Sequence, residues 1–558
     1  MKKIKNMSKK TLLFCAAMGF SIFAGGLTAQ EAESIELDDL TTVVKSGSLT
    51  VTEDALPDFA DVVEKHEGSE YITPKLPDVT VQEKPVLSDA NSGKKEKSVF
   101  AEGKVGGGYP ALFYGDFSVY RLSGQNPFFI GFNHDSAAGY SGHSLKDGYK
   151  DSKTGINLKK TIQKNRATVN LKGDYEVLVN GLQSKVSSIS DITQNDVSGG
   201  GDFTWQFNDI FSAGAALNAE FYNRYSAITG SDSYEDFLKS VSLLGLSPSV
   251  FGNVRVNAFN IDFSTAYWLD ANTDGAIAYN TKRQEAGKLA NRGQFKVGVS
   301  WKNQIFKAYA NVGAVLSDAM NDNYITAPFA VGGAAVFPVK FSNRKASIGL
   351  EGGLSSSRSR VSELEKKFKF TSLTFIPQEV TDWYAQLETS LPVGSGFTVN
   401  ANLSYKKTAF ENGWWQPDYS LPSYKGFYAY KMYDMSVLSS NIELTYIYKI
   451  LSLKAGLKSN WIDIPVLDYN QLVTLGIGLA KENGKYGVNL NSAFGLDDSS
   501  SAIVPIFNLD GFVKITEAVS IGGELTDIIK LLSGTTRTYA GDYIVRSGTA
   551  SVMVKFFF

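Results

Sequence analysis

Apolar and polar residues alternate along much of the chain with a period of two. In the segment RATVNLKGDYEV, residues 166–177, every second residue from Ala167 to Val177 is apolar, aromatic or glycine, and polar residues stand between them. Successive side chains of a β-strand point to opposite faces, so this pattern predicts a strand with one polar face. Residues 441–459 repeat the pattern on both sides of a tight turn, which predicts a hairpin.

Strand length and connection length distinguish a membrane barrel from a soluble sandwich. From residue 98 onward the pattern predicts about 22 strands, with about 16 to 20 as the alternative, and most have the length that a tilted membrane span needs. Short turns are predicted at 163–166, 207–209, 301–304, 341–344, 393–396, 449–450, 482–485 and 515–518, and longer loops at 180–196, 227–250, 357–379 and 409–436. Short turns on one side and long loops on the other are typical of an outer-membrane barrel. The fold class predicted for residues 98–558 is therefore all-β, a transmembrane antiparallel β-barrel.

The residues before the barrel predict export followed by a short extension. Five lysines precede the uncharged run TLLFCAAMGFSIFAGGL, and small residues follow it, so residues 1–29 have the pattern of a secretory signal peptide. The position of Cys15 in the middle of this run, after Phe14, argues against lipidation. Residues 30–97 are acidic at first and then rich in proline, which predicts a largely extended or disordered periplasmic segment.

Composition excludes several classes of function. The one cysteine lies within the predicted signal peptide, so no disulfide and no thiolate metal site is expected in the mature chain. Removal of five lysines with that peptide changes the formal net charge from −2 to about −7, which argues against nucleic-acid binding. No cofactor and no metal site is predicted.

The chain ends in SVMVKFFF, and the period of two gives these residues a direction. Phe558, Phe556 and Val554 fall on one face and Lys555 falls on the other. A terminal aromatic residue preceded by alternating apolar residues resembles the signal read by the barrel-assembly machinery of bacterial outer membranes. Phe556 and Phe558 are therefore the predicted assembly signal, on a last strand that pairs with the first and leaves no open edge.

The last 48 residues carry a family resemblance. The segment 511–558, in which LTDIIKLL is followed by a loop and an aromatic terminal strand, resembles the end of TonB-dependent transporter barrels. Such transporters carry a plug domain before the barrel, and residues 30–97 are too few for a complete one. The stretch IELDDLTTVV, residues 35–44, loosely resembles the short extended segment that pairs with TonB, and a solvated periplasmic tail is the alternative.

One pair of residues suggests chemistry. His134 and Ser136 are spaced to share a strand face, and they resemble the His-x-Ser pair of outer-membrane acyl hydrolases such as phospholipase A and lipid A deacylase. The asparagine that orients the histidine in those enzymes is not at the expected position. A histidine at the membrane edge or in an extracellular loop is the alternative, and the chain is not predicted to be an enzyme.

Residues 410–435 form the most aromatic stretch of the chain. Trp414, Trp415 and Tyr428 are candidates for stacking on a ligand, such as a sugar or an aromatic chelate, at the mouth of the barrel. An aromatic girdle at the outer membrane interface predicts much the same composition. Both interpretations remain open from the sequence.

A barrel of this size encloses a lumen too wide for its wall side chains to fill, so the lumen conducts unless it is plugged. The first hypothesis is an outer-membrane channel for polar solutes, similar to a porin or a TonB-dependent receptor, whose lumen is lined by Arg166, Lys172, Asp174 and Glu176. Its expected partners are outer-membrane lipid, the assembly machinery and a periplasmic or TonB-type protein. The alternatives are a surface protein that binds a ligand or host molecule and is anchored by the barrel, and the acyl hydrolase.

Overall fold

The computed structural model describes part of the chain. The chain divides into two units, Met1–Lys45 and Ser46–Phe558, and the described residues belong to the second unit. The predictions for the signal peptide, for the extension 30–97 and for residues 35–44 lie outside the described residues. The description covers residues 99–558 except 122–125, 141, 186–188, 229–240, 274–288, 319–323, 340–344, 374–375, 378, 395, 410–412, 419–426, 462–470, 482–483, 497–504 and 539–542.

The described residues are mainly strands. The first half of the main sheet consists of β1 (Phe100–Tyr109), β2 (Leu112–Arg121), β3 (Phe128–Ala138), β4 (Lys150–Lys164), β5 (Ala167–Gly181), β6 (Ile189–Gln206), β7 (Phe211–Ile228), β8 (Val241–Val256), β9 (Phe259–Asn272), β10 (Leu289–Lys302), β11 (Phe306–Ser317) and β12 (Tyr324–Thr326). The second half consists of β13 (Phe329–Pro338), β14 (Lys345–Ser357), β15 (Val380–Pro392), β16 (Phe397–Thr408), β19 (Ser436–Tyr448), β20 (Leu451–Asn460), β21 (Gln471–Ala480), β22 (Tyr486–Leu496), β23 (Ile506–Lys514), β24 (Val519–Thr526) and β27 (Thr549–Phe557). The remaining elements are η1 (Leu145–Asp147), α3 (Val361–Lys367), β17 (Trp414–Pro417), β18 (Tyr430–Tyr433), α4 (Ile528–Ser533), β25 (Arg537–Thr538) and β26 (Ile544–Val545).

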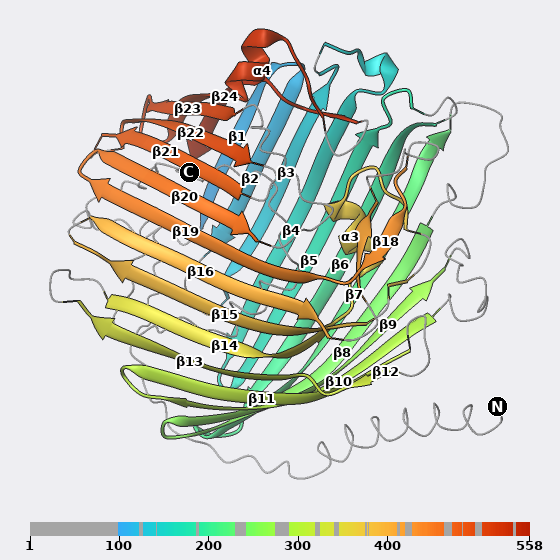
Figure 1. Cartoon of the computed structure of the whole chain (residues 1–558), viewed down its shortest axis with the longest axis vertical. Coiled ribbons are helices and arrows are strands. Elements are labelled where there is room, and N and C mark those ends of the chain that lie inside the picture. Colours follow the sequence, from blue (N-terminus) through green and yellow to red (C-terminus); the bar gives the residue numbers. More distant parts are fainter. Residues whose placement is uncertain are drawn as a thin grey trace. The chain divides into compact units, whose positions relative to one another are not determined.

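The main sheet closes on itself. Each strand pairs antiparallel with its neighbour along the chain, and β1 pairs with both β2 and the last strand, β27. The described part of this sheet contains 23 strands, but β12 is a short piece that pairs with the same strand, β11, as β13 does. The barrel wall therefore has 22 strands, as the sequence pattern predicts, and Figure 1 shows them tilted around a common lumen.

The two ends of the barrel differ in their connections. Both the start of β1 and Phe558 lie at one end, where the backbone of Ala101 and the backbone of Phe558 exchange two hydrogen bonds. The connections at that end are short, such as 165–166 between β4 and β5 and 449–450 between β19 and β20. The long connections lie at the other end, and they include 358–379 and 409–435. This asymmetry is the predicted one, with periplasmic turns and extracellular loops.

Two predicted loops are shorter than expected. β6 begins inside the predicted loop 180–196, and β8 begins inside the predicted loop 227–250. The predictions were wrong there because they equated a strand with its apolar part. Polar segments such as DITQND continue the hydrogen-bonded ladder beyond the apolar band, and β6 and β7 reach 18 residues each.

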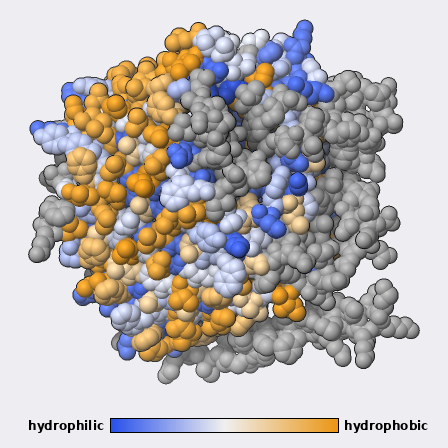
Figure 2. All heavy atoms as spheres, viewed as in Figure 1, coloured by the Kyte–Doolittle hydropathy of each residue, from blue (hydrophilic) through white to orange (hydrophobic). Residues whose placement is uncertain are grey.

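The outer face of the barrel is apolar. On β7, for example, Leu217, Phe221 and Tyr225 are exposed, while Tyr222 and Arg224 between them are buried. Figure 2 shows apolar side chains gathered on the outer surface over strands such as β16, β19, β20 and β21. An apolar exterior around a polar interior is what a barrel in lipid requires, and it places this protein in the outer membrane. No helix among the described residues is long and apolar enough to cross a membrane.

The last strand has the predicted faces. Val552, Val554 and Phe558 are exposed on the outside, and Lys555 lies on the opposite face. The ring of Phe556 lies over Gly103 of β1 and contacts Phe117 of β2 at 5.8 Å between centroids, so aromatic packing covers the seam that the pairing of β1 with β27 closes. The face assignment is confirmed, and the role of these residues in assembly remains a prediction.

Candidate functional site

A loop from the extracellular end of the barrel folds into the lumen. This segment, residues 358–379 between β14 and β15, is called the lumenal loop below and contains helix α3 (Figure 1). The loop contacts Tyr222 and Arg224 of β7. These buried side chains alternate along the strand with exposed ones that face outward, so the loop lies on the inner face of the barrel. Its local sequence explains the helix, because the Glu363 carboxylate accepts a hydrogen bond from the Arg360 N–H at 2.8 Å and caps the first turn.

The lumenal loop has an apolar side that packs against the wall. Val361, Leu364 and Phe368 recur at helical spacing, and they form a buried cluster with wall residues such as Tyr222 and Leu243. The other members of this cluster are Val241, Ala290, Leu373 and Ile376. Each large apolar side chain buried in this way contributes about 1.5 to 3 kcal/mol. The loop is therefore docked on strands β7, β8 and β10 by a small core of its own.

A buried ion pair joins α3 to β7. The Nε atom of Arg224 lies 3.1 Å from Oε2 of Glu365, and both side chains are almost completely buried, with exposures of 2% and 0%. The Tyr222 hydroxyl donates to the same carboxylate at 2.6 Å, and the Leu373 N–H donates to its other oxygen at 2.8 Å. Arg224 also donates to the Ser372 hydroxyl at 3.0 Å. Glu365 is thus bonded both to strand β7 and to the segment that follows α3.

Cations of the loop face anions of the wall. Lys366 lies 2.5 Å from Asp196 on β6 and 3.3 Å from Glu176 on β5. Burial by itself lowers the pKa of Lys366, but the bonds with these two carboxylates outweigh burial and raise its pKa. Arg358 pairs with Asp270 on β9 at 2.5 Å, so strands β5, β6 and β9 each hold the loop by charge.

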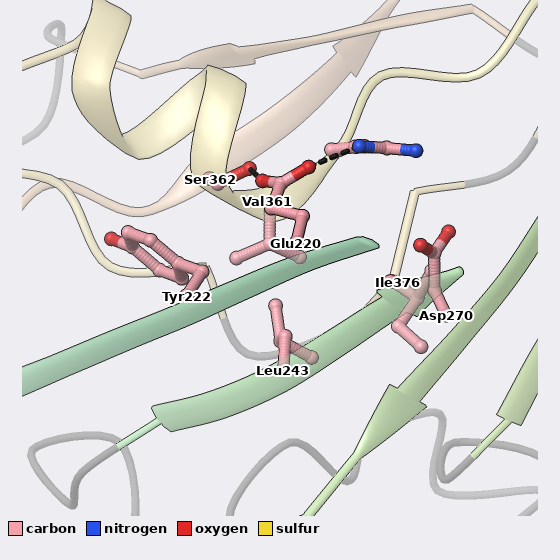
Figure 3. Close-up of a pocket in the computed structure, with 9 residues that line it drawn as sticks. Glu220, Tyr222, Leu243, Asp270, Val361, Ser362 and Ile376 are labelled. Carbon is pink, nitrogen blue, oxygen red and sulfur yellow. Dashed lines mark hydrogen bonds and ion pairs between the residues drawn. The ribbon is translucent and has the colours of Figure 1, made fainter. Parts of the chain in front are cut away.

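A small pocket remains between α3 and the wall. Its lining includes Glu220, Asp270, Arg360, Ser362 and Ile376 (Figure 3). The Glu220 carboxylate accepts a hydrogen bond from the Ser362 hydroxyl at 2.5 Å and is paired with Arg360. Burial lowers the pKa of Arg360, whereas Glu220 and Asp270 raise it, and the net shift is upward. Within this lining Glu220, Arg360 and Ser362 are therefore bonded to one another, and Asp270 is paired with Arg358.

The far end of the loop is held by a second buried pair. Arg292 on β10 donates from Nε to both carboxylate oxygens of Glu379 at 3.1 Å, and its guanidinium lies over the Trp268 ring at 4.5 Å. The Ser356 hydroxyl donates to Glu379 at 2.7 Å. Ser356 lies just before the loop and Glu379 is its last residue, so their hydrogen bond, together with Arg292, holds in place the two points at which the loop leaves and rejoins the wall.

Three extracellular loops meet at an aromatic junction, formed by Phe370, Tyr428 and Tyr543. The rings of Phe370 and Tyr543 are stacked at 3.7 Å, and Tyr428 meets Tyr543 edge-on at 6.3 Å. The Tyr428 N–H also donates to the Phe370 carbonyl at 2.9 Å. Phe370 has a φ of 60°, which is rare for a bulky residue. The junction therefore ties the lumenal loop to loop 409–435 and loop 527–548 at the expense of local backbone strain.

The structure buries two of the three aromatic residues that the sequence suggested for ligand binding. Trp414 donates from its indole N–H to Asp382 at 3.0 Å and is covered by the Lys406 ammonium at 4.2 Å. Trp415 packs against the buried cluster of the lumenal loop, and Tyr428 is only 2% exposed. In this conformation Trp414 and Tyr428 contact other protein residues.

The predicted lumen residues occupy two different places. Lys172, Asp174 and Glu176 lie on the inner face of β5, because they alternate with the exposed Leu171 and Tyr175. Glu176 reaches the lumenal loop through Lys366. Arg166, in contrast, lies in the turn between β4 and β5, where it donates to the carbonyl of Phe207 at 3.0 Å.

His134 and Ser136 are brought together on the outside of the barrel. Nε2 of His134 lies 3.1 Å from the Ser136 hydroxyl, and Nδ1 lies 2.8 Å from the hydroxyl of Thr154 on β4. The two residues share a face of β3 with Ile130 and Phe132, which are exposed. Asp135 lies between them on the opposite face, where it pairs with Arg546 of an extracellular loop. His134 and Ser136 therefore face the lipid.

Comparison with known proteins supports the fold. No family model and no curated protein matches the chain. Among solved structures, the FrpB iron transporter of Neisseria meningitidis is similar with a TM-score of 0.59 and 8% identity, over 83% of each chain. A ferric enterobactin receptor (PfeA) mutant of Pseudomonas aeruginosa has a TM-score of 0.58 and 10% identity, over 83% of this chain and 80% of its own. The copper transporter OprC has a TM-score of 0.58 and 10% identity, over 82% of this chain and 80% of its own.

At this level of identity the likeness concerns the fold. The resemblance to TonB-dependent transporter barrels, inferred from residues 511–558, is confirmed for the architecture of the barrel. All three structures are described as transporters or receptors, not as enzymes.

The lumenal loop was not predicted from the sequence. Residues 357–379 were recognised as a long polar loop, but their partners Arg224 and Glu220 lie more than 130 residues earlier in the chain. One local signal was available. The stretch VSELEKKF, with apolar residues at helical spacing and a glutamate near its start, predicts an amphipathic helix that needs a surface to pack on.

Proposed function

We propose that this protein passes polar solutes across the outer membrane through the lumen of its barrel, and that the lumenal loop is the gate. The observation that carries the proposal is the docking of this loop on the inner wall by the Arg224–Glu365 pair. A wall of 22 strands encloses a space that its own side chains do not fill, so a segment placed inside it controls passage.

The way in which the loop is held favours a movable gate over a permanent plug. The loop is bound to the wall by ion pairs as well as by its small apolar core, and the partly exposed pair of Lys366 with Asp196 can exchange with water or with a charged solute. It is also coupled through Phe370 to the two other loops of the aromatic junction. A ligand that displaces Tyr428 or Tyr543 from the outside would therefore act on the loop inside.

The similar structures support, by analogy of fold, a proposal for the class of solute and for the partner. An iron transporter, a ferric enterobactin receptor and a copper transporter share this fold, so metal chelates belong to the class of polar solutes proposed here. We further propose a periplasmic or TonB-type partner that supplies the energy for displacing the loop. Co-purification from detergent-solubilised envelopes tests this partner.

Single-channel recording in planar lipid bilayers tests the proposed function. The wild-type protein is compared with a variant in which residues 361–373 are replaced by a glycine-serine linker of equal length. We expect low or infrequent conductance from the wild type and a large, sustained conductance from the variant. Lys366→Arg, which retains the positive charge, is the matched control and should behave as the wild type. If the linker variant forms a heat-modifiable barrel that does not conduct, the transport proposal fails and an anchoring role is favoured.

A further inference from the structure

Three side chains outside the lumen form a chain of hydrogen bonds on the lipid-facing surface. Ser136 and His134 lie on β3 and Thr154 lies on the adjacent strand β4, directly opposite His134 in the register. Ser136 is 3.1 Å from Nε2 of the imidazole, and Thr154 is 2.8 Å from Nδ1. A nucleophile within reach of a base that is oriented by a third group is the diagnostic arrangement of covalent catalysis.

These residues lie where the apolar band of the barrel ends. The outward pairs Ile130 with Leu158 and Phe132 with Ile156 are apolar, and the next pair toward the extracellular end is His134 with Thr154. The next outward pair in the same direction is Ser136 with Ser152, and Ser136 lies two residues before the end of β3. The boundary between apolar and polar outward residues marks the level of the membrane interface, where the ester bonds of lipids lie.

We propose that Ser136, His134 and Thr154 form an ester hydrolase site that acts on acyl chains of lipids in the outer leaflet. The substrate class is a long-chain carboxylic ester, present in phospholipids and in lipopolysaccharide. The exposed Phe113, whose ring lies 5.6 Å from the His134 ring, and the exposed Phe132 provide the apolar surface along which an acyl chain packs. This activity is independent of passage through the lumen, because the site is on the other face of the wall.

The hydrogen bonds assign the roles. His134 acts as a base only if Nε2 is unprotonated, and this requires that Nδ1 carries the proton and donates it to the Thr154 hydroxyl. The Ser136 hydroxyl is then placed to donate either to Nε2 or to the carbonyl of Phe113, 3.2 Å away. Thr154 touches no substrate atom and is a positioning residue. Ser152, opposite Ser136, offers a hydroxyl on the same face for the developing oxyanion.

The reaction is an acyl transfer to water. Ser136 Oγ attacks the ester carbonyl carbon while its proton moves to Nε2 of His134. The tetrahedral intermediate collapses with cleavage of the bond to the alcohol oxygen, which takes the proton from Nε2, and an acyl-serine is left. Water then attacks the acyl carbon, gives its proton to Nε2, and the carboxylic acid is released as Oγ recovers that proton.

The test uses the whole protein in detergent micelles and two kinds of measurement. An alkyl fluorophosphonate probe, followed by mass spectrometry, reports which serine reacts, and fatty-acid release is measured separately from a phospholipid and from lipopolysaccharide. We expect the label on Ser136, no turnover in Ser136→Ala, and a loss of about 100-fold or more in His134→Phe. Ser118→Ala is the matched control, because Ser118 lies on the adjacent strand β2 and faces the lumen, where it donates to Glu102 at 3.0 Å.

Substitutions of Thr154 distinguish a catalytic role of the three residues from a structural one. Thr154→Val should lower fatty-acid release while leaving heat modifiability unchanged, and Thr154→Ser should restore it because the hydroxyl returns. The two substrates show whether phospholipid or lipopolysaccharide supplies the ester. The proposal is overturned if the folded wild type leaves Ser136 unlabelled, or if fatty-acid release from both substrates is the same in wild type and Ser136→Ala.

Discussion

Replacement of Glu365 by glutamine should open the gate, because it removes the charge that compensates the buried Arg224. The carboxylate of Glu365 lies 3.1 Å from Nε of Arg224, and neither side chain is reached by water. Glutamine has the same shape, so packing of α3 is preserved and the change is mainly one of charge. Arg224 can be hydrated again when the lumenal loop leaves the wall, so the substitution raises the free energy of the docked state only.

The magnitude follows from the burial of the pair. Breaking a buried ion pair by removing one partner costs about 3 to 5 kcal/mol. At about 1.4 kcal/mol for each factor of ten, the ratio of undocked to docked loop should rise by about two to three and a half powers of ten. The matched control is Glu363→Gln, two residues away on the exposed side of α3, where the side chain can still accept the capping bond from Arg360. Its effect should stay within about 1 kcal/mol.

The assays are the fraction of time that single channels are open and the hydrogen exchange of backbone amides in α3. Both should increase in Glu365→Gln, and both should remain close to wild type in Glu363→Gln. Equal open fractions and equal exchange in the two variants would show that the Arg224–Glu365 pair does not hold the loop. Increased exchange without increased conductance would show that the loop is held as described but is not the gate.

Three further predictions concern assembly and the coupling of the loops. Phe558→Ser should lower the amount of heat-modifiable barrel more than Phe557→Ser, since only the first ring faces lipid; equal losses would mean that the face is irrelevant. Deletion of residues 30–90 should leave a barrel that assembles, because the spanning strands and the terminal signal lie downstream, and degradation of the truncated protein would contradict this. Phe370→Ala should raise hydrogen exchange in the lumenal loop by removing the stack on Tyr543, at a cost of about 3 kcal/mol, and unchanged exchange would exclude coupling through this ring.

Much of the barrel could be predicted from the sequence, because the direction of a strand side chain is a local property. The period of two in residues 166–177 places Asp174 and Glu176 on the polar face without knowledge of any other strand, and the same period assigns Phe558 and Lys555 to opposite faces. Short turns also carry local signals, and the predicted turns such as 449–450 lie at the end of the barrel that holds Phe558. The spacing of His134 and Ser136 likewise shows that the two residues share a face.

Only the tertiary structure decided what the long loops do. A polar loop of charged residues has the same composition whether it extends into solvent or folds into a lumen, since the difference lies in its partners. Glu365 meets Arg224, and Lys366 meets Asp196, through strand pairings that bring distant parts of the chain side by side. The orienting hydroxyl of Thr154 was missed for the same reason, because the register between β3 and β4 places it opposite His134. Local periodicity determines the direction of a side chain, whereas register and closure of the barrel determine what it meets.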